Sequence, residues 1–380
     1  MHTPSTFDLA ICGAGPVGMA LAALLVQRGA RADGIVLLDA KSIEQARRDP
    51  RTIALSHGSR QILEEAGAWP VEATPIHTIH VSRRGQFGRS LMDRDEHGVE
   101  ALGYVARYGA VVSVLADVCA RLGVATVRPA LVTGSAEDGD GVSVQIEQDG
   151  ASSTLRASLL VQAEGGLFGQ QQERAVSRDY GQSAIIAHVR TSAPIAHRAF
   201  ERFTDEGPLA LLPQDDGYAL VWCVPPTRAE HLLALDDAAF LARLGAAFGS
   251  RLGRFTHATP RLAYPLGLNA QAGGTARTVA IGNAAQTLHP VAGQGLNLGL
   301  RDAAVLARAL AQDSSPAGLE RYVARRQADR GLTVRVTDTM ARIFTGSAPT
   351  QGLLGLSLGL LDAFPPARKG LAALMMYGRR

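Results

Sequence analysis

Residues 7–18 read FDLAICGAGPVG, and they carry the strongest indication of the fold. It begins with an apolar run of strand length, passes through three glycines, and opens a segment, residues 19–28, with the apolar spacing of a helix. A second apolar run, residues 35–38, ends at Asp39. A strand, a glycine-rich turn, a helix and a second strand in this order predict a βαβ unit.

The three glycines, Gly13, Gly15 and Gly18, indicate what this unit binds. Glycine permits the tight turn, the close approach of backbone to a pyrophosphate, and the packing of helix on strand. The diphosphate would lie at the helix N-terminus, where unpaired N–H groups and the helix dipole favour negative charge. Asp39 could accept hydrogen bonds from ribose hydroxyls, which favours an adenosine with a free 2′-OH. The pattern predicts dinucleotide binding, with a purely structural turn as the alternative.

A second glycine-rich segment follows another buried strand, residues 278–281. It contains Gly282, Asn283 and Pro290, then GQGLNLG at residues 293–299, and a long helix follows. Two glycine-rich helix starts in one chain are explained if they contact the two ends of one cofactor. This arrangement favours FAD over NAD. Peptide N–H groups of the GQGLN stretch could stabilise negative charge on a reduced isoalloxazine, and Asn283 could bond a ribityl hydroxyl. A glycine-rich helix cap is the alternative.

Composition narrows the class of protein. A chain of 380 residues, 46% of them hydrophobic, suggests two packed domains with a sizeable core. The net charge of +3 with scattered arginines gives no signal for nucleic-acid binding. Cys12, Cys119 and Cys223 lie far apart, which argues against a disulfide framework or a zinc site and favours a reducing cytosol. No signal peptide or membrane-spanning run is expected, and no metal site is predicted.

The order of elements predicts an α/β fold: a Rossmann-like FAD-binding domain with an inserted mostly-β substrate domain and a C-terminal helical segment. The FAD-binding domain is expected to be discontinuous. Its predicted parts are 1–75, 101–179 and 267–345; the substrate-binding sheet domain takes 76–100 and 180–266, and a helical tail takes 346–380. Helices are expected over 56–66, 111–122 and 236–248, and residues 40–55 are expected to form a charged loop.

Several segments carry a family resemblance that covers nearly the whole chain. Residues 51–56, RTIALS, resemble an arginine loop beside a flavin, and residues 283–290 read NAAQTLHP. With residues 199–204, 207–210 and 220–223, they resemble the group A flavoprotein aromatic hydroxylases, which have the para-hydroxybenzoate hydroxylase fold. Within that group they are similar to the ubiquinone-biosynthesis 2-polyprenyl-6-methoxyphenol hydroxylases, which carry Asn where most of the superfamily has Asp.

The resemblance implies an oxidoreductase with FAD as cofactor, NAD(P)H as electron donor and O2 as co-substrate. The implied reaction is hydroxylation of a polyprenylated phenol in ubiquinone biosynthesis through a flavin C4a-hydroperoxide. It also places His289 and Pro290 near the reactive face of the flavin, with the carbonyl of Pro290 facing the substrate hydroxyl. His289 could help to deprotonate a phenol, with a hydrogen-bonded positioning role as the alternative.

The predicted cofactor-binding residues come from both glycine-rich segments and from the strand ends between them. Arg51 could neutralise the pyrophosphate or a nicotinamide phosphate, because a guanidinium pairs well with phosphate oxygens. Asp302 is expected to cap or support the second glycine turn. The full predicted set is Gly13, Gly15, Pro16, Gly18, Asp39, Arg51, Glu164, Gly165, Gly282, Asn283, Gly293, Gln294, Gly295, Leu296 and Asn297.

One segment departs from the family pattern. The superfamily has Asp-Gly followed by Ser, and often Arg, at a strand end that touches FAD and NAD(P)H. Here Glu164 and Gly165 precede Phe168, and Gln171 stands where Arg is usual. The departure supports an alternative function, a catalytically weak flavin-binding scaffold subunit of a quinone-biosynthesis assembly. Another flavin enzyme on the same fold, such as a prenyl reductase or a halogenase, is a third reading.

The C-terminal tail permits two readings. Residues 352–361 are rich in leucine and glycine, and basic residues follow them. This pattern is typical of an interfacial helix on an anionic membrane, and a helix that covers the core is the alternative. The expected location is the cytoplasm, with peripheral contact to the inner membrane as an option. Other quinone-biosynthesis enzymes are candidate partners, and nucleic acid is not.

Overall fold

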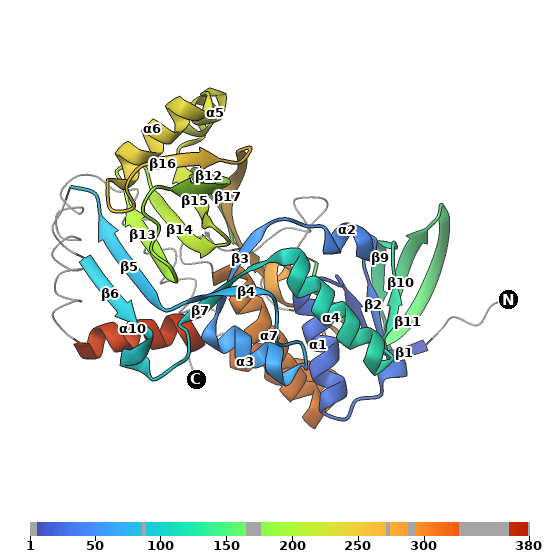
Figure 1. Ribbon diagram of the computed structural model, residues 1–380. Helices are drawn as coiled ribbons and strands as arrows, with labels where there is room; N and C mark the ends of the chain where they lie inside the picture. The colour runs from blue at the N-terminus through green and yellow to red at the C-terminus, as the bar shows by residue number, and fades with distance from the viewer. Residues whose placement is uncertain are drawn as a thin grey trace.

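The structure, a computed structural model, describes residues 6–85, 89–164, 176–270, 274–287, 294–326 and 365–378. Over these ranges the chain forms two large sheets and one small sheet. The first large sheet lies beside helices α1, α4 and α7, and the second carries helices α5 and α6 on its far side (Figure 1). This arrangement confirms the predicted α/β class.

The first large sheet contains the βαβ unit. Its described strands, in spatial order, are β8 (Ala125–Val127), β2 (Ile35–Leu38), β1 (Thr6–Cys12), β11 (Ala151–Gln162), β10 (Val142–Gln148) and β9 (Leu131–Glu137), with β18 (Thr278–Ala280) also paired to β11. The pairs β8–β2, β2–β1, β1–β11 and β11–β18 are parallel. The carboxyl ends of β1, β2, β11 and β18 therefore meet at one edge, where ligands of open α/β sheets bind.

Three helices bury one face of this sheet: α1 (Pro16–Gln27), α4 (Tyr108–Leu122) and α7 (Gln294–Gln312). Apolar residues of β1 and β2, such as Ile11 and Leu37, are fully buried against them. On the other face Ala10 and Val36 pack against β10 and β11. Because both faces are covered, β2 is apolar along its whole length rather than alternating.

The second large sheet collects strands from distant parts of the chain. Its described strands, in spatial order, are β19 (Gln286–Thr287), β17 (Leu262–Ala270), β12 (Val176–Thr191), β15 (Gly217–Val224), β14 (Pro208–Gln214), β13 (Arg198–Phe203), β5 (Thr78–Arg83) and β6 (Arg89–Asp93), and β16 (Phe255–Ala258) pairs with β12. Helices α5 (Pro226–Ala234) and α6 (Asp237–Phe248) cover one face. The sheet takes its strands from 76–100 and 180–266, and it continues beyond them at Val176, Ala270 and β19.

A small sheet, β3 (Thr52–Ser56), β7 (Gly103–Arg107) and β4 (Ala73–Ile76), joins the two large ones. Helix α3 (His57–Glu65) follows β3, and a short helix, α2 (Ile43–Arg47), precedes it. The prediction of a loop over 40–55 was therefore wrong. Ser42 and Gln45 form a reciprocal capping box that starts α2, and β3 exists through pairing with β7, a partner that local sequence does not reveal.

The C-terminal helix α10 (Pro365–Tyr377) packs on the body of the protein (Figure 1). The ring of Tyr377 meets His57 edge-on with centroids 5.6 Å apart, and Ala372 and Met376 bury against β6. The described part of the tail therefore covers core residues, and residues 346–364 lie outside the described ranges. Across those ranges, no helix combines the length and the apolar character needed to cross a membrane.

The crossing of α1 and α7 generates a first prediction. A Cβ at Gly299 of α7 would lie 2.7 Å from Cγ2 of Val17 on α1, so Gly299→Ala overpacks the crossing. We expect a loss of about 1–3 kcal/mol in the free energy of unfolding, measured by urea denaturation. Val17→Ala removes the obstructing methyl groups, so the double variant should be more stable than the sum of the single losses predicts. Strictly additive losses would contradict this contact.

Candidate functional site

The first glycine turn lies at the carboxyl end of β1. Gly13 has φ of +108°, and a Cβ there would lie 2.6 Å from the carbonyl carbon of Ala163, so only glycine fits. A Cβ at Gly18 would lie 2.0 Å from the carbonyl oxygen of Gly13. Gly15 is the extended N-cap of α1, and no side chain caps it. The helix therefore presents unpaired N–H groups to an anion, with Pro16 at the start of its first turn.

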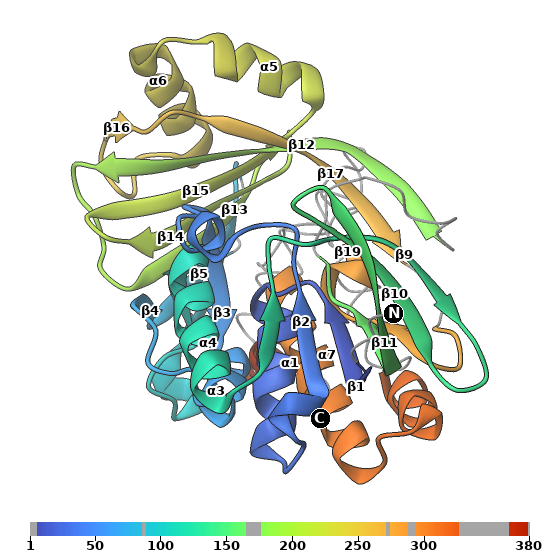
Figure 2. The same ribbon diagram turned by 90° about the vertical axis from the view of Figure 1, so that its right-hand side faces the viewer.

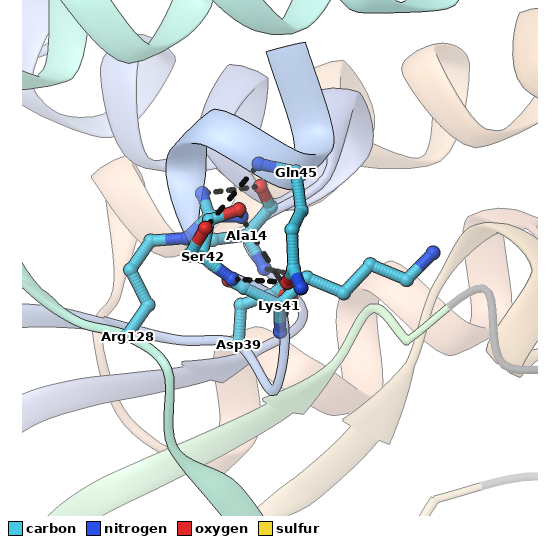
Figure 3. A network of polar contacts seen from close by, with 6 residues as sticks. All are labelled: Ala14, Asp39, Lys41, Ser42, Gln45 and Arg128. Carbon is cyan, nitrogen blue, oxygen red and sulfur yellow. Dashed lines mark hydrogen bonds and ion pairs between the residues drawn. The ribbon is translucent and has the colours of Figure 1, made fainter. Parts of the chain in front are cut away.

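Asp39 closes this turn from the end of β2. Its Oδ2 accepts a hydrogen bond from the backbone N of Ala14 at 2.9 Å, and its Oδ1 accepts one from the N of Lys41 at 2.8 Å (Figure 3). Each carboxylate oxygen keeps a free lone pair, because an ionised carboxylate can accept about four hydrogen bonds. The side chain is 18% exposed, so it can still accept a hydrogen bond from a bound hydroxyl group.

Arg128 belongs to the same network, although no sequence motif pointed to it. Its Nη2 lies 3.8 Å from Oδ1 of Asp39, and its Nε donates to the carbonyl oxygen of Lys41 at 2.9 Å (Figure 3). Its side chain is 7% exposed, so its guanidinium is a buried charge beside the turn. The only available signal was its position directly after β8, which is too weak to read without knowing that β8 pairs with β2.

Arg51 lies at the start of β3, near the N-terminus of α1. It stacks 4.5 Å over the ring of Tyr108, whose hydroxyl lies 3.0 Å from the Cβ position of Gly15. Asp49 accepts hydrogen bonds from both Nε and Nη2 of Arg51. The carboxylate of Asp49 is the main reason that the pKa of Arg51 is raised, and Tyr108 and Tyr264 contribute less. Half of the Arg51 side chain stays exposed beside the glycine turn.

Glu164 follows β11 and is the second carboxylate near this turn. Its side chain reaches solvent, but neighbouring protein atoms remove part of its hydration. This desolvation, followed by the negative charge of Asp39, raises the pKa of Glu164. Two acids therefore flank the turn, while Cys12 beneath them is buried and has its pKa raised to about 12 by that burial and by Glu164.

The second glycine segment meets the first. Gly282 begins the 3-10 turn η3 (Gly282–Ala284) with φ of +60°, and its N donates to Oδ2 of Asp302 at 3.0 Å. Asp302 is fully buried and also pairs with Arg326, so it supports the turn as expected. The Cβ positions of both Gly282 and Gly299 lie against Val17 of α1. The two glycine-rich segments therefore adjoin the same end of α1.

The remaining residues of the second segment divide into two groups. Asn283 is exposed, and its Oδ1 lies 3.9 Å from the Cβ position of Gly295 at the start of α7. Asn297 is buried, and its Oδ1 accepts from the N of Ser56 at 2.8 Å while its Nδ2 donates to the carbonyl of Ala54. The amide of Asn297 therefore ties α7 to β3.

Some predicted residues cannot be placed. Gly165, Gly293, His289 and Pro290 lie outside the described residues, and so do Phe168 and Gln171 of the departing segment. Gln294 begins α7, and Leu296 is half-buried in the first turn of that helix. The described part of the site thus contains the first glycine turn, Asp39, Arg51, Glu164, Gly282, Asn283 and the start of α7.

These residues fit a dinucleotide. The uncapped N-terminus of α1 and the close backbone of Gly13 suit a diphosphate, and Asp39 suits a ribose. The second helix start, α7, lies beside the first through Gly299. A dinucleotide with a long second half, such as FAD, would extend from one helix start to the other.

Comparisons with known proteins agree with this geometry. Residues 6–335 match the family model described as FAD binding domain. The chain is 33% identical to protein slr1300 of Synechocystis, covering 99% of this chain and 94% of that one, and 32% identical to ubiquinone hydroxylase UbiL of Rhodospirillum rubrum, covering 95% and 87%. Its fold is similar to that of p-nitrophenol 4-monooxygenase PnpA of Pseudomonas putida, with a TM-score of 0.74, 19% identity and coverage of 99% and 100%.

The Asp39 network predicts a loss of cofactor affinity. Asp39→Asn removes the charge and places an amide NH2 against a backbone donor. We expect the dissociation constant for FAD, measured by titration of the FAD-free protein, to rise about 10- to 150-fold, equivalent to about 1.5–3 kcal/mol. Asp33→Asn, an exposed acid just before β2, is the matched control. Equal FAD affinity in Asp39→Asn and the unaltered protein would refute the role of Asp39.

The raised pKa of Glu164 gives a pH prediction. A carboxyl whose pKa is higher in the folded state than its ordinary 4.5 destabilises the fold when it is ionised. This destabilisation is complete at a pH above the pKa of Glu164 in the folded protein, and it disappears at a pH below the ordinary pKa of the carboxyl. Glu164→Gln should therefore raise the urea-unfolding free energy of the FAD-free protein at about pH 8, and the gain should vanish near pH 4. Glu147→Gln, an exposed acid of β10, should show no such pH-dependent gain.

Proposed function

The chain belongs to the family of FAD binding domains, and from that premise we propose that it hydroxylates the ring of a polyprenylated phenol in ubiquinone biosynthesis. Its enzyme class is that of an FAD-dependent monooxygenase that uses NAD(P)H and O2. The substrate class within the proposal follows the name of the relative UbiL, a ubiquinone hydroxylase.

One structural observation carries the proposal. The two glycine-rich helix starts adjoin each other at Val17, Gly282 and Gly299, at the carboxyl edge of the first sheet. A single cofactor with two chemically different halves uses both helix starts, whereas a simple NAD site needs only the first. The second large sheet stands over this edge (Figure 2), and the proposal assigns the substrate to that sheet.

Each part of the described site has a task in this proposal. The N-terminus of α1 holds the diphosphate, Asp39 binds the ribose of the adenosine, and Arg51 balances phosphate charge. Asn283 and the N–H groups at the start of α7 bind the flavin half, with Glu164 at its border. FAD, when bound, supplies the redox chemistry that takes electrons from NAD(P)H and uses them to activate O2.

The protein must also hold the phenol dry and in a fixed orientation. Exclusion of water and close placement of the ring are the main contributions that the chain itself makes to such a reaction. His289 and Pro290 remain part of the proposal as the residues beside the phenolic hydroxyl. A polyprenyl tail needs an apolar exit, so contact with a membrane surface belongs to the same proposal.

The test uses the purified protein with bound FAD. In the presence of 2-geranylphenol, NADH or NADPH should reduce the flavin faster than without the phenol in stopped-flow measurements. Mass spectrometry should then show one oxygen atom from 18O2 in the product. Bound FAD with no phenol-accelerated reduction would instead support a scaffold subunit. In a deletion strain, mass spectrometry of accumulated quinone precursors would identify the ring position, and the absence of any such precursor would contradict the pathway.

A further inference from the structure

The second large sheet has two chemically different faces. Strand side chains alternate between the faces. The face under α5 and α6 carries large buried side chains: Ile185, Phe200, Leu211, Tyr218 and Trp222. On the opposite face, alanines occupy many of the alternating positions: Ala184, Ala199, Ala210 and Ala219. The helix-covered face therefore carries large side chains, whereas many side chains of the opposite face are small.

The alanine-rich face is turned toward the FAD-binding part of the chain (Figure 2). At one end Ala199 packs against Ile76 and Val105 of the small sheet. At the β5 edge, Ile79 and Val81 pack in the cluster that α10 completes. The face is thus bordered by the small sheet and by α10.

A row of cross-strand neighbours lies between these borders. It runs across five strands and consists of Val81, Glu201, Ala210, Val221 and Ile186. Each of these side chains is half-buried, whereas the neighbouring residues on the helix-covered face are almost all fully buried. The row therefore borders a space that solvent reaches, and Glu201 is its only polar member.

The position of Glu201 follows from its neighbours on β13. Phe200 meets Phe248 of α6 with ring centroids 5.5 Å apart, and Nε of Arg202 donates to the carbonyl oxygen of Ala247 at 3.4 Å. Both flanking side chains therefore point toward α6, which leaves Glu201 on the alanine-rich face. Its charge also acts on Cys223 of the same face, where it adds to the burial that raises the pKa of that thiol.

The carboxylate of Glu201 has no partner within the described parts of the chain. The other ionisable groups on this face in β5 and β15 are Arg83, which lies 3.8 Å from Asp205, and the neutral thiol of Cys223. In the described part of α10, Lys369 is exposed and Tyr377 packs on His57. Burial alone raises the pKa of Glu201 to about 7. An unpaired carboxylate in such a place is costly to keep for stability alone.

We propose that Glu201 accepts the proton of the phenolic hydroxyl when the substrate ring lies across this row, an inference that rests on the proposed function. The O–H bond of the phenol breaks, its electron pair stays on the phenol oxygen, and the proton forms a new O–H bond on the carboxylate of Glu201. The ring becomes a phenolate, which is more electron-rich and more reactive toward activated oxygen.

Burial makes Glu201 suited to this task. A glutamate whose pKa is about 7 is a stronger base in its ionised form than an ordinary glutamate. Its pKa is also closer to that of a phenol, which is about 10, so proton transfer from the phenol is less unfavourable. The acid form cannot accept a proton, so the rate should fall as the pH drops below about 7. The half-buried apolar residues of the row, such as Val221 and Ile186, would contact the ring.

The experiment compares the FAD-loaded protein with Glu201→Gln, Glu201→Leu and a control, Glu230→Gln, an exposed acid of α5 beyond the opposite face. The probes are 2-geranylphenol and its methyl ether 2-geranylanisole, which has no proton to lose. Glu201→Gln should bind the phenol but lose about 100-fold or more in kcat, together with the rise of rate with pH. Glu201→Leu should also lose the preference for binding the phenol over the ether. Glu230→Gln should match the unaltered protein.

The outcomes separate the two proposals. If the unaltered protein hydroxylates 2-geranylphenol and both Glu201 variants keep its kcat and pH profile, the role of Glu201 is refuted while the function stands. Loss of bound FAD in Glu201→Gln would show a structural role and would also refute it. If the unaltered protein binds FAD but hydroxylates no phenol, the proposed function fails and the role of Glu201 fails with it.

Discussion

The absence of a side chain at Gly13 allows the backbone after β1 to lie against the carbonyl group of Ala163, and the rest of the site depends on this approach. Gly18 then lets α1 pack directly on the turn, which points the N-terminus of the helix at the sheet edge. Gly299 of α7 likewise has no side chain, so α7 packs closely on Val17 of α1 and its start lies beside the start of α1. A methyl group at any of these positions would separate elements that must touch.

The charges around this edge are arranged by the same geometry. The N-terminus of α1 favours an anion, and both Arg51 and Arg128 lie near the turn. Asp39 is held by backbone N–H groups, while loss of hydration and, after it, the negative charge of Asp39 raise the pKa of Glu164. The site thus combines positive charge for phosphates with carboxylates for hydroxyl groups, a combination that suits a dinucleotide.

The two faces of the second large sheet differ in side-chain size and burial. Large residues under α5 and α6, such as Trp222 and Phe240, form a closed core that needs no ligand. The opposite face combines small side chains with one carboxylate, Glu201, in a row that solvent still reaches. Successive side chains along each strand point to opposite faces. One sheet can therefore carry a closed core on one face and half-buried residues on the other.

The sequence alone was enough to predict the α/β class and the FAD cofactor, because a strand, a glycine turn and a helix are local patterns with a local physical cause. It could not give β3, Arg128 or Glu201 their places, since each depends on a partner far along the chain. The amide of Asn297 illustrates the difference: its spacing suggested the cofactor, but folding brought Ser56 and Ala54 to it. Which polar groups bond within the protein and which are left for a ligand depends on the tertiary structure. The reason is that many hydrogen-bond partners are far apart in the sequence and come together only on folding.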